Sequence, residues 1–88
     1  MDAKQSLLEF PCQFPIKVMG LAGRDFDDFV VEIVRKHVPK LAEDAVARRL
    51  SSQGKYTSVT VTFEAKSQAQ LDALYTELSG HERIMMVL

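Results

Sequence analysis

The 88-residue chain carries 11 basic and 12 acidic residues, a formal net charge of −1, and 47% of its residues are hydrophobic. This size predicts one small domain, the hydrophobic fraction excludes a disordered chain, and the balanced charge gives no general attraction to nucleic acid or to an anionic membrane. A single cysteine, Cys12, excludes an internal disulfide and a Cys-x-x-Cys metal site, and no membrane span or signal peptide is visible. The expected location is therefore the cytoplasm.

Residues 1–13 are predicted to form an N-terminal arm that precedes a single domain over residues 14–88. Prolines on both sides of Cys12 interrupt any helix and favour extended or turn geometry. Leu7, Leu8 or Phe10 is expected to dock the arm on the domain. Nothing near Cys12 in the sequence predicts a reactive thiol.

A first strand is predicted over residues 14–21. Its side chains alternate, with Ile16 and Val18 on one face and Lys17 and Met19 on the other. One face of this strand is therefore expected to pack on a core and the other to stay polar.

A first helix is predicted after Gly20 and Gly23, which loosen the backbone. Asp25 is the predicted N-cap, and Pro39 ends the helix. Its buried face follows the i, i+3, i+4, i+7 spacing of Phe26, Phe29, Val30, Ile33, Val34 and His37.

The clearest strand signal lies in residues 51–65, the second arm of a predicted hairpin. From position 57 the chain alternates strictly, and its core face is expected to carry Thr57, Val59, Val61, Phe63 and Ala65. Gly54 marks the turn, where the backbone is expected to need positive φ. Residues 45–52 are predicted to form the first arm, with Val46 and Leu50 pointing inward.

The last third of the chain predicts a second helix and a final strand. Ser67 and Gln70 form a capping-box pattern, and Gly80 is the predicted C′ residue. Residues 84–88 form an apolar strand whose two adjacent methionines are expected on opposite sheet faces. The buried stripe of the helix is Leu71, Leu74, Tyr75 and Leu78.

This order of elements, β-α-β-β-α-β, predicts the α+β class. The expected fold is a ferredoxin-like sandwich with a four-stranded antiparallel sheet in the order 4-1-3-2 and both helices on one face. The other sheet face is expected to stay open and to carry Lys17, Met19, Arg49, Tyr56, Ser58, Thr60 and Thr62.

No catalytic or metal-binding motif stands out, so neither an enzyme nor a cofactor is expected. His37 and His81 lie at helix ends, without cysteine or acidic residues at metal-ligand spacing, and are expected to be surface or capping residues. Asp25, Asp27 and Asp28 are typical of a helix start, because one helical turn supplies too few converging oxygens for a metal.

Protein interaction is the favoured function. The final strand is short, apolar and uncharged, and an edge strand of that kind invites strand addition by a partner or by a second copy. The hypothesis is therefore a non-enzymatic regulatory or interaction module.

Two alternatives stay open. The loop over residues 20–25, with Gly20, Gly23 and Arg24, joins strand to helix as the ligand loop of ACT-type amino-acid-sensing domains does, which suggests a sensor of a small carboxylic metabolite. A tight turn into the helix is the favoured explanation of these glycines, and the loop lacks the Asp-x-Pro-Gly pattern common in ACT domains. Single-stranded RNA binding through the open face is disfavoured, because Tyr56 beside Lys55 is one aromatic without a basic field.

Five segments resemble the YbeD-like family of small bacterial proteins: residues 8–11, 14–20, 51–59, 74–78 and 86–88. The resemblance implies a ferredoxin-like fold similar to ACT-type regulatory domains, a cytosolic location and no catalytic residues. Some members carry a lipoate regulatory label. The matching motif residues cluster on the open face and the hairpin: Lys17, Gly20, Ser51, Ser52, Gly54, Tyr56 and Ser58.

That clustering leads to one hypothesis about the site. Lys17, Tyr56 and Ser58 lie on two strands expected to be adjacent at the centre of the sheet. They are predicted to form a polar contact patch for a partner protein or a small acid.

Overall fold

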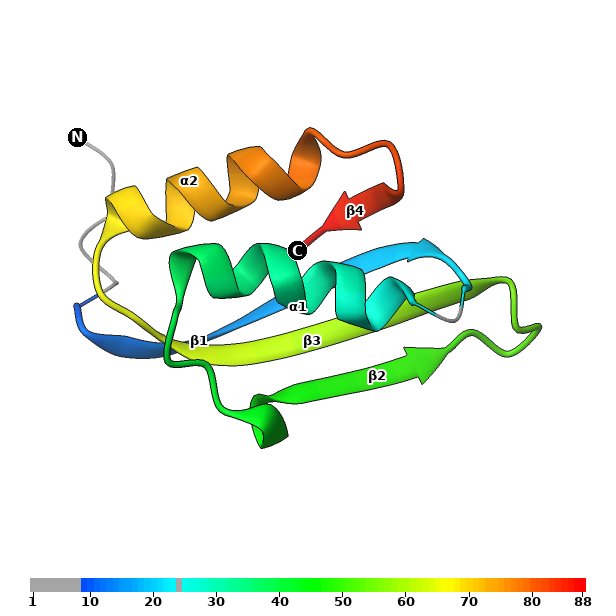
Figure 1. Ribbon diagram of the computed structural model, residues 1–88, viewed down its shortest axis with the longest axis horizontal. Helices are drawn as coiled ribbons and strands as arrows, with labels where there is room; N and C mark the ends of the chain where they lie inside the picture. Colours follow the sequence, from blue (N-terminus) through cyan, green and yellow to red (C-terminus); the bar gives the residue numbers. More distant parts are fainter. Residues whose placement is uncertain (1–8, 24) are drawn as a thin grey trace.

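The computed structural model describes residues 9–23 and 25–88. Its strands form one antiparallel sheet in the order β2-β3-β1-β4, and both helices cover the same face of it (Figure 1). This arrangement confirms the predicted ferredoxin-like α+β sandwich. The elements follow one another as β1 (Cys12–Leu21), α1 (Phe26–His37), the short 3-10 helix η2 (Glu43–Ala45), β2 (Val46–Leu50), β3 (Tyr56–Ala65), α2 (Gln68–Ser79) and β4 (Ile84–Val87).

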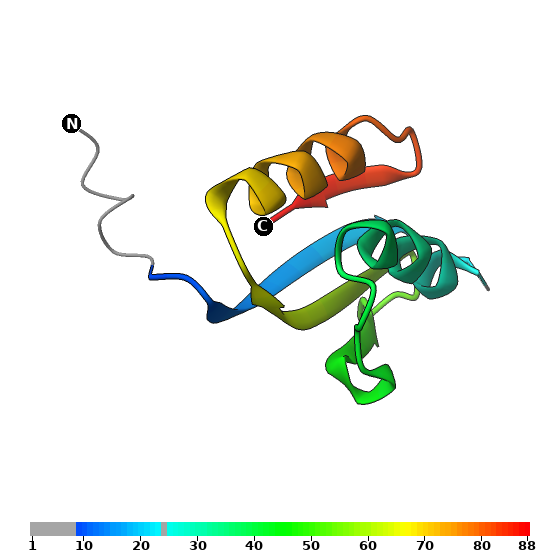
Figure 2. The same ribbon diagram turned by 60° about the vertical axis from the view of Figure 1, so that its left-hand side comes forward.

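The core lies between the two helices and the two central strands, β1 and β3 (Figure 2). Each element contributes the residues that its period places on one side, and burying these apolar side chains is the main favourable term for folding. The fully or almost fully buried residues are Ile16, Val18, Phe26, Val30, Ile33, Val34, Val59, Val61, Phe63, Ala65, Leu71, Leu74 and Leu78.

Aromatic contacts extend the core toward the start of β1. Phe14 packs edge-on against Phe63, with ring centroids 6.1 Å apart, and against Tyr75, with centroids 6.5 Å apart. Partial burial raises the pKa of the Tyr75 hydroxyl. Phe10 packs against the same core, whereas the predicted docking residues Leu7 and Leu8 lie outside the described residues.

The register of the sheet confirms the predicted faces of the central strands. Ile16 lies opposite Val61 and Val18 opposite Val59, so buried residues face buried residues. The intervening positions form the uncovered face, with Lys17 opposite Thr60. Strand ends differ slightly from the prediction, since β1 begins at Cys12 and β2 is limited to Val46–Leu50.

Leu50 is a first correction, because the sequence predicts it as a core residue and it is 61% exposed. It pairs with the buried Thr57 and so lies on the helix side of the sheet, but at the end of an edge strand that no helix covers. Arg48 on the same side is also exposed and bonds Asp27 of α1 at 2.9 Å.

The predicted positions of Met85 and Met86 need a second correction. Regular alternation along the strand predicts one of them on each face of the sheet. Met86 lies opposite Met19 and Ile84 opposite Gly20, with an irregularity in register between these pairs, so Met85 is an extra residue in the strand. Both methionines are exposed, Met85 by 59% and Met86 by 49%.

The helix ends agree with the sequence in part. The Ser67 hydroxyl accepts a hydrogen bond from the backbone N–H of Gln70 at 3.1 Å, as the capping pattern predicts. Gly80 is the C-cap in a right-handed conformation, φ −81°, rather than the predicted C′ residue. Asp25 occupies the N-cap position of α1, but its side chain makes no capping bond.

Candidate functional site

The loop after β1 and the β2–β3 hairpin meet at one end of the sheet, where many of the predicted binding residues lie. The N–H of Ala22 donates to the carbonyl of Lys55 at 2.9 Å. The Ser51 hydroxyl accepts from the N–H groups of Lys55 and Tyr56 at 3.2 and 3.1 Å, and Gly54 has φ +72° as predicted. Ser51 and Gly54 therefore have a structural task, which is to close the hairpin.

The glycines of the predicted ligand loop differ from each other. A Cβ on Gly20 would lie 2.5 Å from both the Phe26 ring and the Arg83 carbonyl, so only glycine lets α1 pack this closely. A Cβ on Gly23 would meet nothing nearer than 3.8 Å. Arg24 lies outside the described residues, and Ser52 is exposed at the hairpin turn.

Asp25 is held by a residue from the far end of the chain. Arg83 donates two hydrogen bonds to its carboxylate, at 2.8 and 3.3 Å, and the guanidinium lies over the Phe29 ring, 4.6 Å from its centroid. These bonds lower the pKa of the Asp25 carboxyl and raise the pKa of Arg83. The loop is thus clamped to the segment that leads into β4.

The predicted polar patch of Lys17, Tyr56 and Ser58 lies on the open face, with Ser58 between the other two residues. Tyr56 lies opposite Leu21 and Ser58 opposite Met19, whereas Lys17 is four positions from Leu21 along β1. At about 3.3 Å per residue, Lys17 and Tyr56 are separated by roughly 13 Å along the strands. Met19 and Ser58 lie between them.

Apolar side chains gather on the open face where β1 meets β4. Met86 lies opposite Met19, and Leu88 exchanges backbone hydrogen bonds of 2.8 and 3.0 Å with Lys17, which places it on the same face. Leu21 is 62% exposed and Leu88 61%. We call Met19, Leu21, Met86 and Leu88 the open-face apolar patch.

This patch is the feature that reasoning from the sequence missed. The alternation of β1 already assigned Met19 to the open face, but the partners of β4 residues depend on the irregularity at Met85. Without the register, the apolar residues of the last strand cannot be assigned to a face.

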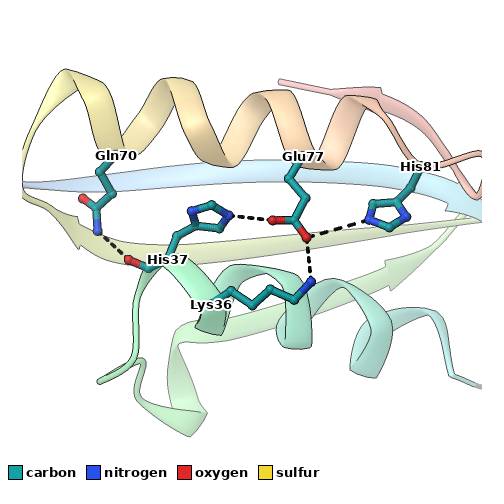
Figure 3. A network of polar contacts seen from close by, with 5 residues as sticks. All are labelled: Lys36, His37, Gln70, Glu77 and His81. Atoms are coloured by element: carbon teal, nitrogen blue, oxygen red, sulfur yellow. Dashed lines mark hydrogen bonds and ion pairs between the residues drawn. The ribbon is translucent and has the colours of Figure 1, made fainter.

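A polar network joins the two helices around one carboxylate (Figure 3). Glu77 of α2 accepts hydrogen bonds from Lys36 at 2.7 Å and contacts the His37 ring nitrogen at 2.8 Å, and His81 lies 3.9 Å away. The bond from Lys36, and then that with His37, lowers the pKa of the Glu77 carboxyl. Gln70 donates to the carbonyl of His37 at 2.9 Å, which ties the end of α1 to the start of α2.

The sequence therefore placed both histidines correctly near helix ends, but it did not reveal that both lie close to the carboxylate of Glu77. No group of three or more potential metal ligands occurs within residues 9–23 and 25–88. The network contributes to helix packing.

A cavity of about 590 Å³ lies at the end of the sheet away from the hairpin. It is bounded by the connection between α1 and β2, the last residues of β3 and the start of α2. None of the predicted site residues lines it.

In the part of the chain that the structure describes, no helix is long and apolar enough to cross a membrane.

The chain matches known proteins over nearly its whole length. The family described as "Protein of unknown function (DUF493)" matches residues 5–88. A UPF0250 protein of Chromobacterium violaceum is 48% identical over 87 residues, covering 99% of this chain and 98% of that relative. A UPF0250 protein of Neisseria gonorrhoeae is 45% identical over 87 residues, covering 99% and 96%.

One solved structure shares the fold. The solution structure of protein HP0495 from H. pylori has a TM-score of 0.71 to this chain and is 14% identical. The similarity covers 99% of this chain and 91% of that one. At that identity the comparison supports the ferredoxin-like arrangement alone.

Proposed function

Because the chain belongs to the DUF493 family, a family of unknown function, we propose its role from its surface: it is a non-enzymatic interaction module that binds a partner protein through the open-face apolar patch. The observation that carries this proposal is the exposure of Leu21, Met86 and Leu88 on one sheet face. Contiguous exposed apolar side chains are characteristic of interaction sites.

The surroundings of the patch support a protein partner. Lys17, Ser58 and Thr60 border the apolar residues on the open face, which gives the apolar centre and polar rim of a typical interface. Methionine side chains are flexible and polarizable, so Met19 and Met86 can adapt to the shape of a partner.

The face of the sheet is a better candidate than its edge. The sequence predicts strand addition at β4, but β4 has only four residues and Met85 interrupts its pairing. Such irregularities are a common means of protecting an edge from pairing.

The metabolite sensor and the RNA-binding module stay predictions that no specific observation favours. In the proposed ligand loop, the space above Gly20, the N–H of Ala22 and the carboxylate of Asp25 are each used by contacts within the protein. On the described open face, Tyr56 is the single aromatic side chain.

Site-specific photo-crosslinking in the native cells tests this proposal. A photoreactive phenylalanine analogue at position 86 is expected to yield a discrete crosslinked protein, and the same analogue at position 21 is expected to yield the same product. The matched control is position 50, since Leu50 is as exposed as Leu88 but lies on the helix side of the sheet.

Two results would overturn the proposal. One is the absence of any crosslinked product from positions 21 and 86. The other is the same set of products from position 50 as from position 86, which would indicate random encounters. A product of twice the chain mass would identify the partner as a second copy.

A further inference from the structure

Strand β2 forms the sheet edge opposite to β4, and its outward main-chain groups can be identified. The sheet order places β3 on one side of β2 and no strand on the other. Ser51, directly after β2, donates its N–H to the carbonyl of Tyr56 at 2.8 Å, toward β3. Main-chain groups alternate in direction along an antiparallel strand, so Arg49 also faces β3. Arg48 and Leu50 therefore turn their N–H and C=O groups away from the sheet.

This edge is regular and open. Pairing of β2 with β3 continues without interruption from Val46 to Leu50, unlike the pairing of β4 with β1. The 3-10 helix η2 lies at the start of β2, beside Val46, and no other described element lies beyond the strand (Figure 1). Residues 47–50 are all exposed. A regular, exposed edge of this kind can pair with a further strand.

The two arginines of β2 differ in their surroundings. Arg48 lies on the helix side, where it bonds Asp27 at 2.9 Å. Arg49 lies on the open face opposite Ser58 and makes no ion pair with another described residue. Glu64 is the single acidic residue in the four strands, and it lies six positions from Ser58 along β3, about 20 Å away. A positive charge at this edge thus lacks an acidic neighbour.

The helix side of the same edge offers an apolar contact and a polar one. Leu50 is 61% exposed, so an apolar side chain placed opposite it would cover apolar surface. A cavity of about 300 Å³ lies further along, between α1 and β2, and its lining includes Asp28, Arg35 and Arg48. This charged lining favours a polar residue opposite Arg48.

The charges favour another protein over a second copy as the occupant. If two β2 strands paired antiparallel over their full length, Arg48 would lie directly opposite Arg48 of the second copy, and like charges in that position are destabilising. A shift toward the hairpin would place Arg49 opposite Arg49. A shift the other way would centre the pairing on Ala47 and bring in Val46, beside η2.

We propose that the outer edge of β2 binds an extended, acidic segment of another protein, paired antiparallel through the main chains of Arg48 and Leu50. The segment has an apolar residue opposite Leu50, then an acidic residue opposite Arg49, then a polar residue opposite Arg48. Residues directly opposite share a face, so the acidic side chain meets Arg49 on the open face. Main-chain pairing supplies the affinity and the side chains supply the selectivity.

This site is independent of the open-face apolar patch, because β2 and β4 are the two opposite edges of the sheet. A protein bound at β2 is therefore expected to crosslink from position 50 as a product that differs from the product at position 86. The two proposals can fail separately.

The test uses acetyl-Ser-Val-Glu-Thr-Ser-amide and the full chain labelled with ¹⁵N. In the proposed register the valine of the peptide lies opposite Leu50, its glutamate opposite Arg49 and its threonine opposite Arg48. Titration is expected to shift the amide signals of Arg48 and Leu50 in a saturable manner, because their N–H groups gain hydrogen bonds. The expected dissociation constant is on the order of 1 mM for so short a probe.

A charge exchange tests the contact with Arg49. Replacing the glutamate of the peptide by lysine is expected to weaken binding about two- to fivefold, and the Arg49→Glu variant is expected to reverse that preference. Lys17→Glu is the matched control, since it makes the same change in charge on the same face but on β1, with β3 and β2 between it and the peptide. It is expected to keep the preference for glutamate.

A pair of N-methylated peptides tests the main-chain pairing and leaves the protein unchanged. The N–H of the threonine points to Arg48 in the proposed register, so its methylation is expected to weaken binding about tenfold or more, the loss of at least one hydrogen bond. The N–H of the glutamate points away from β2, so its methylation is expected to leave binding unchanged.

Four outcomes would overturn the inference. The first is no saturable shift at Arg48 and Leu50. The second is an equal loss from the two N-methylated peptides. The third is the same charge preference in the wild type and in Arg49→Glu. The fourth is the appearance of these shifts when the protein alone is concentrated, which would identify the occupant as a second copy.

Discussion

Gly20 illustrates how a single residue in this fold can be mistaken for a ligand contact. It opens a loop that resembles a metabolite-binding loop, but its missing side chain is needed because the Phe26 ring and the Arg83 carbonyl occupy that space. Gly23, three residues later, has no such neighbours. Substitution of Gly20 is therefore expected to change the stability of the protein, whereas substitution of Gly23 is not.

The Gly20→Ala variant is expected to lose about 1–3 kcal/mol of unfolding free energy, because the added methyl group forces α1 away from the sheet. Equilibrium urea denaturation measures this loss. Gly23→Ala is the matched control and is expected to unfold close to the wild-type midpoint, since the nearest atom to its Cβ would be 3.8 Å away. Equal stability of the two variants would refute the packing role of Gly20.

At the scale of elements, α1 and α2 are joined by contacts that the sequence does not reveal. Glu77 meets Lys36 and His37, residues 41 and 40 positions away. Folding lowers the pKa of Glu77, so the folded protein binds this proton less tightly than the unfolded chain does. The stability from this group is complete above the ordinary glutamate pKa and is lost as the pH falls through the lowered one.

The Glu77→Gln variant is expected to be less stable than the wild type at neutral pH by up to about 1 kcal/mol, because partly exposed ion pairs are screened by water. The gap is expected to close as the pH falls below the ordinary glutamate pKa. Urea denaturation over a pH series measures it, with Glu32→Gln on the exposed side of α1 as the control. A gap that stays constant with pH would show that the charge of Glu77 does not matter.

Most of the fold could be predicted because it rests on local periodicity. The strict alternation in β1 and β3 assigns Val18, Val59 and Lys17 to their faces, since the backbone of a strand fixes a period of two. The exposure of Leu50 could not be predicted, because burial of a residue on an edge strand depends on how far α1 extends over that edge of the sheet. The faces of β4 were also beyond prediction, because Met85 shifts the register in a way that no local pattern signals.

The candidate site depended even more on tertiary contacts. The polar residues were assigned to the correct sheet face, but Ser51 turned out to close the hairpin. The open-face apolar patch combines residues from the two ends of the chain, and the cavity combines Gln13 with the connection after α1 and with the segment that runs from the end of β3 into α2. Such combinations follow from the register and the helix positions, which the sequence does not specify.

At the scale of the whole molecule, the fold covers only one face of its sheet (Figures 1 and 2). Both helices are used to build the core, and the described chain places no helix on the open face. That face is polar over β2 and β3 but apolar where β1 meets β4. Our account assigns this apolar region to a protein partner.

The most direct test of that claim is the methyl spectrum of the protein labelled at its methionine methyl carbons, recorded first purified and then in an extract of the cells that naturally make it. We expect the Met19 and Met86 signals to shift or broaden together in the extract, and the change at Met19 to be lost in Met86→Lys but kept in Leu50→Lys. Met19 and Met86 signals that are identical in the purified sample and in the extract would contradict the account.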